Sequence, residues 1–97
     1  MLVRIVRMTF KAECREAFKA HFESIKSIVR GFDGCLFLEL YADADNENVM
    51  VTHSHWRDAA ALEAYRTSET FAKIWKETKP FMSEKTFAFS MYKISEA

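Results

Sequence analysis

Three histidines are the side chains of this sequence best suited to exchange a proton near neutral pH. His53 and His55 are separated by one residue in a segment of strand composition, so we expect their side chains on the same face. Two imidazoles on one face favour a first-row metal, but a stable site needs a third ligand. Glu39 supplies one only if the strand register places it on that face. We favour the alternative, a hydrogen-bonded polar patch without a metal.

His21 falls within the apolar stripe of a predicted helix, between Phe18 and Phe22. One interpretation is a core histidine with a hydrogen-bond partner, such as Tyr65 or an ordered water. The other is a general base facing a pocket between helix and sheet, suited to deprotonating a phenol or an enol. If the protein is an enzyme, we expect His21, ahead of His53, to be that base.

Four aromatic side chains form a second candidate group. Trp56, Tyr65, Phe71 and Trp75 are spaced so that they could enclose a flat ligand, although aromatic residues at helical spacing are more often core. Tyr65 and Trp75 also carry a hydrogen-bond donor. We therefore expect these two to contact a substrate most directly.

The composition excludes several classes of function. The chain has 97 residues, is 49% hydrophobic and balances 14 basic against 14 acidic residues, which predicts one folded domain over 1–97 that binds neither nucleic acid nor an anionic membrane. Residues 1–10 are too short and too charged to span a bilayer. Cys14 and Cys35 show no disulfide spacing and no catalytic partner, so we expect reduced thiols and a cytoplasmic location. No phosphate loop, nucleotide fingerprint or zinc motif is present.

Hydrophobic periodicity predicts alternating strand and helix elements. Asp58 and Ser68 are natural N-caps, so the second helical region should break at Thr67–Ser68. The expected order is β-α-β-β-α-β, an α+β fold with a ferredoxin-like four-stranded antiparallel sheet. The predicted strands are 2–10, 35–42, 49–56 and 85–94, and the predicted helices are 12–30, 59–66 and 69–79.

The first two predicted strands are apolar on both faces. In 2–10, Val3 and Ile5 alternate with Leu2 and Val6, and 35–42 is similar. A sheet with helices on one face leaves the other face to be covered. The simplest cover is a second copy of the chain, so we expect a homodimer formed through the sheet face.

Several local sequences carry a resemblance to a known family. They are the turn Gly31–Phe32–Asp33–Gly34, the hairpin end Trp56–Arg57–Asp58, and Leu62 and Tyr65 followed by Thr67–Ser68–Glu69 and Phe71. Together they resemble the antibiotic biosynthesis monooxygenase family, the dimeric α+β barrels. The resemblance implies a pocket between sheet and helices, and in some members oxidation of phenols or quinols by O₂ without an added cofactor.

The haem-degrading members of that family use an Asn, a Trp and a His. The corresponding positions here are Val6, Tyr65 and Trp75, none of which matches. The expected function is therefore cofactor-independent monooxygenation of a small aromatic phenol or quinol. The alternative is a non-catalytic dimeric barrel that binds a small aromatic ligand or acts as an interaction module.

Overall fold

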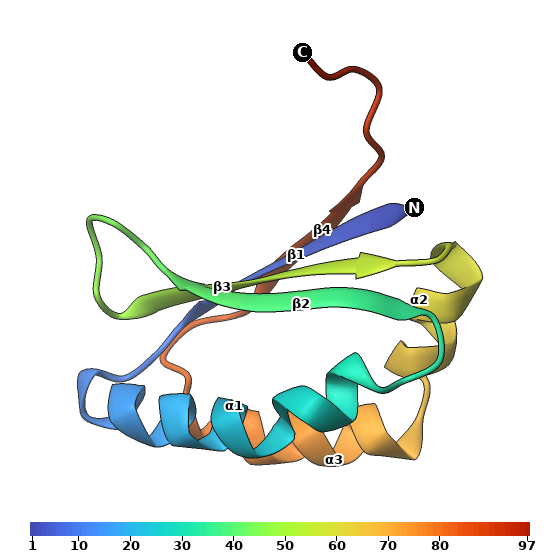
Figure 1. Cartoon of the computed structure of the whole chain (residues 1–97). Coiled ribbons are helices and arrows are strands. Elements are labelled where there is room, and N and C mark those ends of the chain that lie inside the picture. The colour runs from blue at the N-terminus through green and yellow to red at the C-terminus, as the bar shows by residue number, and fades with distance from the viewer.

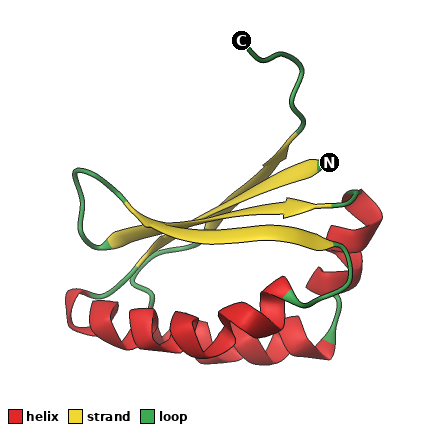
Figure 2. Ribbon diagram, viewed as in Figure 1, coloured by secondary structure: helices red, strands yellow, loops and turns green.

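A four-stranded antiparallel sheet forms one layer of the molecule. The computed structural model describes all 97 residues. The strands lie in the order β2-β3-β1-β4, which confirms the predicted ferredoxin-like arrangement (Figure 2). Their bounds are β1 (Leu2–Thr9), β2 (Cys35–Ala42), β3 (Val49–Trp56) and β4 (Phe87–Met91).

Helices form the second layer, on one face of the sheet only. Figure 1 shows α1 and α3 side by side beneath the sheet, with α2 at one end. Their bounds are α1 (Arg15–Arg30), α2 (Ala59–Arg66) and α3 (Glu69–Thr78), with short 3₁₀ turns η1 (Ala12–Cys14) and η2 (Lys79–Phe81). None of the helices has the length and apolar character needed to cross a bilayer.

Side-chain caps explain why the second helical region is divided. The Asp58 carboxylate accepts a hydrogen bond from the Ala61 backbone N–H at 2.8 Å and so begins α2. The Ser68 hydroxyl donates to the Tyr65 carbonyl at 2.6 Å and accepts from the Phe71 N–H at 3.1 Å. Ser68 therefore ends one helix and begins the next, as predicted.

The turn between α1 and β2 requires a glycine at Gly34. Its φ of +92° lies in the left-handed region, and a Cβ there would stand 2.4 Å from the Ala61 Cβ. The backbone of this turn therefore packs directly against the start of α2. The same turn is also bound to the end of β3, because the Arg57 N–H, next to Trp56, donates to the Gly34 carbonyl at 2.8 Å.

The observed elements differ from the predicted ones mainly at the ends. β1 ends at Thr9, since Phe10 forms only an isolated bridge with Met82. Residues 12–14 form a 3₁₀ turn before α1. β4 covers 87–91 rather than 85–94, because its pairing with β1 ends at Met91. The residues that follow project away from the globule (Figure 1).

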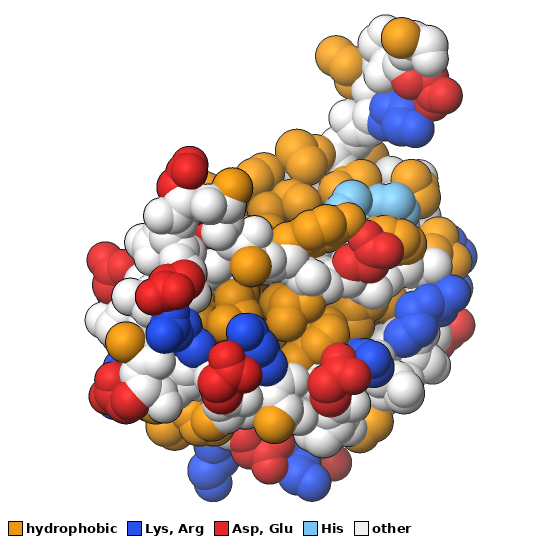
Figure 3. Space-filling model, turned by 60° about the vertical axis from the view of Figure 1, so that its left-hand side comes forward, with side chains coloured by type: hydrophobic (Ala, Val, Ile, Leu, Met, Phe, Trp, Pro, Cys, Tyr) orange, Lys and Arg blue, Asp and Glu red, His pale blue; other side chains and the backbone are white.

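The two faces of the sheet differ in their partners. Alternate residues such as Arg4 and Val6 face the helices, and the residues between them form what we call the open face. One row across the open face is Glu39, His53, Ile5 and Phe89, because these residues are direct register partners. Large apolar side chains stay exposed there, with Phe87 62% accessible. Figure 3 shows histidine side chains among hydrophobic ones at this side of the molecule.

Candidate functional site

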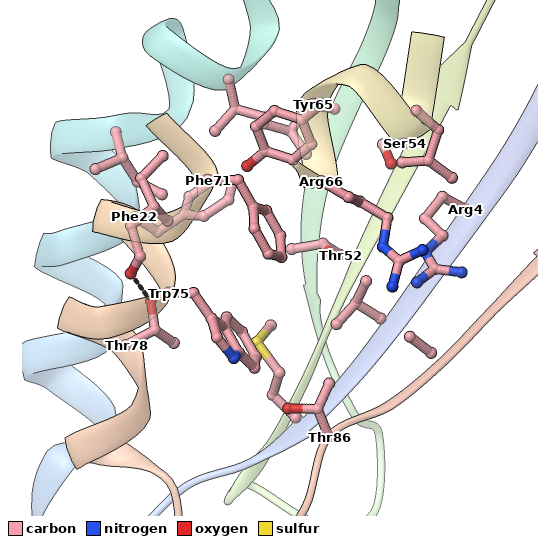
Figure 4. A pocket seen from close by; sticks show the side chains of 18 of the residues that line it. Arg4, Phe22, Thr52, Ser54, Tyr65, Arg66, Phe71, Trp75, Thr78 and Thr86 are labelled. Carbon is pink, nitrogen blue, oxygen red and sulfur yellow. Dashed lines mark hydrogen bonds between the residues drawn. The ribbon is translucent and has the colours of Figure 1, made fainter. Parts of the chain in front are cut away.

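A pocket of about 370 Å³ lies between the sheet and the helices (Figure 4). This volume is within the usual range for sites that bind small molecules. Of its twenty lining residues, fourteen are hydrophobic. β1 supplies one wall with Val6 and Met8, and α1 supplies another with Phe18 and Phe22. The interior is therefore apolar, which excludes water from a bound ligand.

The four aromatic residues predicted to enclose a ligand all line this pocket and form a continuous series. Trp56 stacks on Tyr65 with ring centroids 5.0 Å apart, and Tyr65 meets Phe71 edge-on at 5.2 Å. Phe71 in turn stacks near Trp75 at 6.2 Å, with an angle of 11° between the rings. Such a series presents ring faces and edges suited to a flat aromatic ligand.

These aromatic residues contribute in different ways. Trp56 is only 1% exposed, and its indole N–H donates to the Ser54 hydroxyl at 3.0 Å, so it serves mainly as a wall. Tyr65 is 9% exposed, and its hydroxyl has no hydrogen-bond partner within the chain. Burial, with a smaller effect from Cys35, raises the pKa of Tyr65 to about 12. The phenol is therefore a neutral hydrogen-bond donor at physiological pH.

The charged side chains that line the pocket are both arginines. Arg4 comes from β1 and Arg66 from the end of α2. The Arg4 guanidinium donates to the Ser90 hydroxyl at 3.1 Å. Burial and the nearby charge of Arg66 both lower the pKa of Arg4. No aspartate, glutamate or histidine lines the pocket, so it contains no conventional general base.

His21 does not line this pocket, contrary to the expected orientation. Its ring lies beside Phe18 and Phe81, with centroids 6.3 and 6.1 Å away. Its Nε2 lies 3.4 Å from the hydroxyl of Thr78, a residue that lines the pocket, so the partner is not Tyr65 and His21 reaches the pocket only through Thr78. The side chain sits at the edge of the apolar stripe of α1, where the stripe meets the end of α3 rather than the sheet. The geometry gives no support to His21 as the base.

His53 and His55 lie on the open face of the sheet, opposite to the pocket. Their Nε2 atoms are 3.0 Å apart, and His55 stacks on Phe37 with ring centroids 4.6 Å apart. Burial first, and then the charge of His53, lower the pKa of His55. Glu39 does share this face, but its carboxylate accepts a hydrogen bond from the Tyr41 hydroxyl. No group of three ligating side chains in the chain is placed to hold a metal ion.

Sequence reasoning missed the two arginines of the pocket. Arg4 shares with Leu2 and Val6 the face of β1 that meets the helices, and a charged residue among apolar ones on one face of a strand is a signal that the sequence offers. Arg66 carried no comparable signal, because a basic residue in the last turn of a helix is common. The helix-facing residues Thr52 and Ser54 could have been found from Trp56, which shares their face.

The fold and the site together define a class of protein. It consists of α+β proteins with an aromatic pocket between a four-stranded sheet and its helices. The family model described as antibiotic biosynthesis monooxygenase matches residues 1–77. The chain therefore belongs to the antibiotic biosynthesis monooxygenase family.

Solved structures share the whole fold. Rv0793 from Mycobacterium tuberculosis is 22% identical, covers 99% of this chain and 97% of its own, and has a TM-score of 0.87. PA3566 from Pseudomonas aeruginosa is also 22% identical, with coverage of 97% and 94% and a TM-score of 0.83. A crystal structure described as an antibiotic biosynthesis monooxygenase is 20% identical, with coverage of 98% and 100% and a TM-score of 0.88. At these identities the likeness establishes the fold alone.

One curated relative has a different description. A protein of Natronomonas pharaonis, whose name describes it as a candidate heme-binding protein, is 35% identical over 63 residues. The match covers 65% of this chain and 10% of that protein. The chain thus spans about a tenth of the length of this relative.

Proposed function

We propose that the protein is a monooxygenase that oxidises a small aromatic phenol or quinol with O₂ inside the pocket between sheet and helices. The observation that carries this proposal is the series of rings from Trp56 to Trp75 along an apolar cavity of about 370 Å³. Family membership supports the reaction type. The proposal requires no cofactor, because an electron-rich substrate anion can itself reduce O₂.

The reaction balances with the substrate as the only reductant. An aromatic hydroxyl loses its proton, and the resulting anion transfers electrons to O₂. One oxygen atom is then inserted into the ring, the other leaves as water, and the substrate supplies all four electrons. A pocket without carboxylate or imidazole favours substrates that ionise easily in bulk water, so that the phenol or quinol loses its proton to solvent and enters the pocket as the anion.

Two donors in the pocket could stabilise the substrate anion. The Tyr65 phenol stays protonated because its pKa is raised to about 12, and its hydroxyl is free to donate. Trp75 lines the same cavity and carries an indole N–H, and Figure 4 shows both side chains on the helical side. Donors fixed in an apolar site stabilise a developing oxyanion more than water does.

A homodimer formed through the open face is part of this proposal. Support comes from the exposed apolar side chains of that face, which include Phe87 at 62%, Phe89 at 38% and Met91 at 43% accessibility. A partner sheet packed there would cover them while leaving the helix-side pocket intact. The free thiols Cys14 and Cys35 support a reducing location such as the cytoplasm.

Haem binding is a second candidate, raised by the name of the Natronomonas pharaonis relative. The pocket residues do not fit this group well. The lining offers neither imidazole nor thiolate as an axial ligand, and the raised pKa of Tyr65 keeps its phenol protonated. Titration with hemin, followed by the Soret band, tests this candidate. We expect no saturable shift of the band, and a stoichiometric shift would favour haem binding.

A binding module without catalysis is the third candidate, favoured by the missing base. Oxygen uptake with a panel of quinols and anthrones separates it from the monooxygenase. Ala88 lines the pocket from β4, so Ala88→Trp should fill the cavity and abolish uptake. Ala20→Trp introduces the same side chain at an exposed position of α1 and should leave uptake unchanged. Aromatic ligands that bind without any uptake across the panel would establish the binding module instead.

A further inference from the structure

Two guanidinium groups come together at one side of the apolar pocket. Arg4 reaches it from β1 and Arg66 from the last turn of α2. Figure 4 shows the two groups next to each other, across the cavity from Trp75 and the helix that carries it. The two groups are close enough for the charge of Arg66 to be one cause, after burial, of the lowered pKa of Arg4.

The positive charge of this pair is poorly neutralised. Arg4 forms no ion pair, and its hydrogen-bond acceptor is the uncharged Ser90 hydroxyl. Arg66 pairs with Glu63 at 3.3 Å, but both side chains are exposed, by 47% and 62%, so solvent screens this pair. No acidic residue lines the pocket, so an anionic ligand would be the only negative charge within it.

The positive charge at the pocket is a local feature of this site. Basic and acidic residues balance at 14 each, so the positive charge at the pocket does not reflect an overall basic protein. Guanidinium groups bind carboxylates through paired hydrogen bonds, and a partly dry site strengthens that contact. Of the other eighteen lining residues, fourteen are hydrophobic and four are serine or threonine, so none of them carries a charge.

We propose that Arg4 and Arg66 form a carboxylate-binding subsite and that the ligand of this pocket is an aromatic acid. Its ring lies against the aromatic series, and its carboxylate lies between the two guanidinium groups. This inference rests on the proposed function only in using the same pocket, and it defines the class of substrate. The carboxylate also fixes which ring edge faces Tyr65 and Trp75. The arginines are thus specificity-determining residues.

A pair of ligands that differ in charge but not in shape tests the subsite. The probes are 2-naphthoate and its neutral amide, 2-naphthamide, and binding is followed by the fluorescence of Trp56 and Trp75, which both line the pocket. We expect the naphthoate to bind at least about tenfold more tightly, as charge-assisted hydrogen bonds imply. Added salt should weaken the naphthoate and leave the naphthamide unaffected.

Variants assign the effect to the two arginines. Arg66→Gln, at an exposed helix position, and Arg4→Gln should each remove most of the preference for naphthoate without changing the affinity for naphthamide. Arg57→Gln, an exposed arginine outside the pocket, is the matched control and should change neither. Equal binding of both probes by the native protein would overturn the subsite while the pocket function stands. Binding of neither probe would contradict the pocket as an aromatic site and overturn both proposals.

Discussion

Replacement of Tyr65 by Phe isolates a single hydroxyl inside the pocket. The Tyr65 side chain is 9% exposed, and burial raises its pKa from 10.0 to about 12. The Phe variant keeps the ring contacts with Trp56 and Phe71 and removes only the ionisable group. The variant therefore tests whether the pocket is as dry, and the phenol as firmly neutral, as the proposed donor role requires.

The expected magnitude follows from the pKa difference. An acid whose pKa is raised on folding stabilises the native state below its unfolded pKa, and this stability is lost as the pH rises through the folded value. For Tyr65 the loss falls between about pH 10 and pH 12. A difference of about two pKa units corresponds to about 3 kcal/mol in the free energy of unfolding.

Chemical denaturation of both proteins at a series of pH values measures this loss. All other side chains are the same in both proteins, so the difference between native and Tyr65→Phe isolates Tyr65. We expect that difference to be constant up to about pH 9 and then to shift by about 2 kcal/mol against the native protein by about pH 12, where the folded Tyr65 is half ionised. A difference that stays constant throughout would refute the reasoning, because Tyr65 would then titrate like an exposed phenol.

Three further predictions concern other parts of the molecule. Ser68→Ala should lower the free energy of unfolding by about 1 kcal/mol through loss of the α3 cap, whereas Ser27→Ala on the exposed side of α1 should not. Equal denaturant midpoints for Ser68→Ala and the native protein would show that the cap is unimportant. His21→Ala should retain oxygen uptake once a substrate is known, because His21 lies outside the pocket lining; loss of turnover in a folded variant would restore it as the base. Because the pKa of His55 is lowered on folding, the stability it provides is present above its unfolded pKa of about 6.5 and is lost as the pH falls below that value. His55→Gln should therefore show a smaller loss of stability than the native protein between about pH 7 and pH 5, and identical pH profiles would count against this assignment.

Strong local signals made much of the fold predictable from the sequence. Asp58 and Ser68 determine where α2 and α3 begin through local hydrogen bonds, so both helix starts were predicted correctly. Strands β2 and β3 matched because the polar turn of 43–48 separates two clear apolar runs. The end of β4 could not be predicted, since it depends on where pairing with β1 stops.

The candidate site was only partly predictable, for a geometric reason. The aromatic residues were identified because their spacing brings them to one side of the helices and one end of β3. The orientation of His21 was not predicted correctly. Helical periodicity places a residue on an apolar stripe but does not say whether that part of the stripe meets the sheet or another helix. Arg4 was overlooked because a charged residue is usually taken to face solvent. Its side chain instead lines a cavity whose existence depends on the tertiary packing.

Oxygen-18 labelling tests the central claim most directly, namely that the pocket performs monooxygenation. A quinol or anthrone that supports uptake is oxidised under labelled O₂, and the product and the water are analysed by mass spectrometry. We predict one labelled oxygen in the product and one in water for the native protein and for Ala20→Trp, with no labelled product from Ala88→Trp. An unlabelled product, or labelled product formed equally well by Ala88→Trp, would contradict oxygen insertion within this pocket.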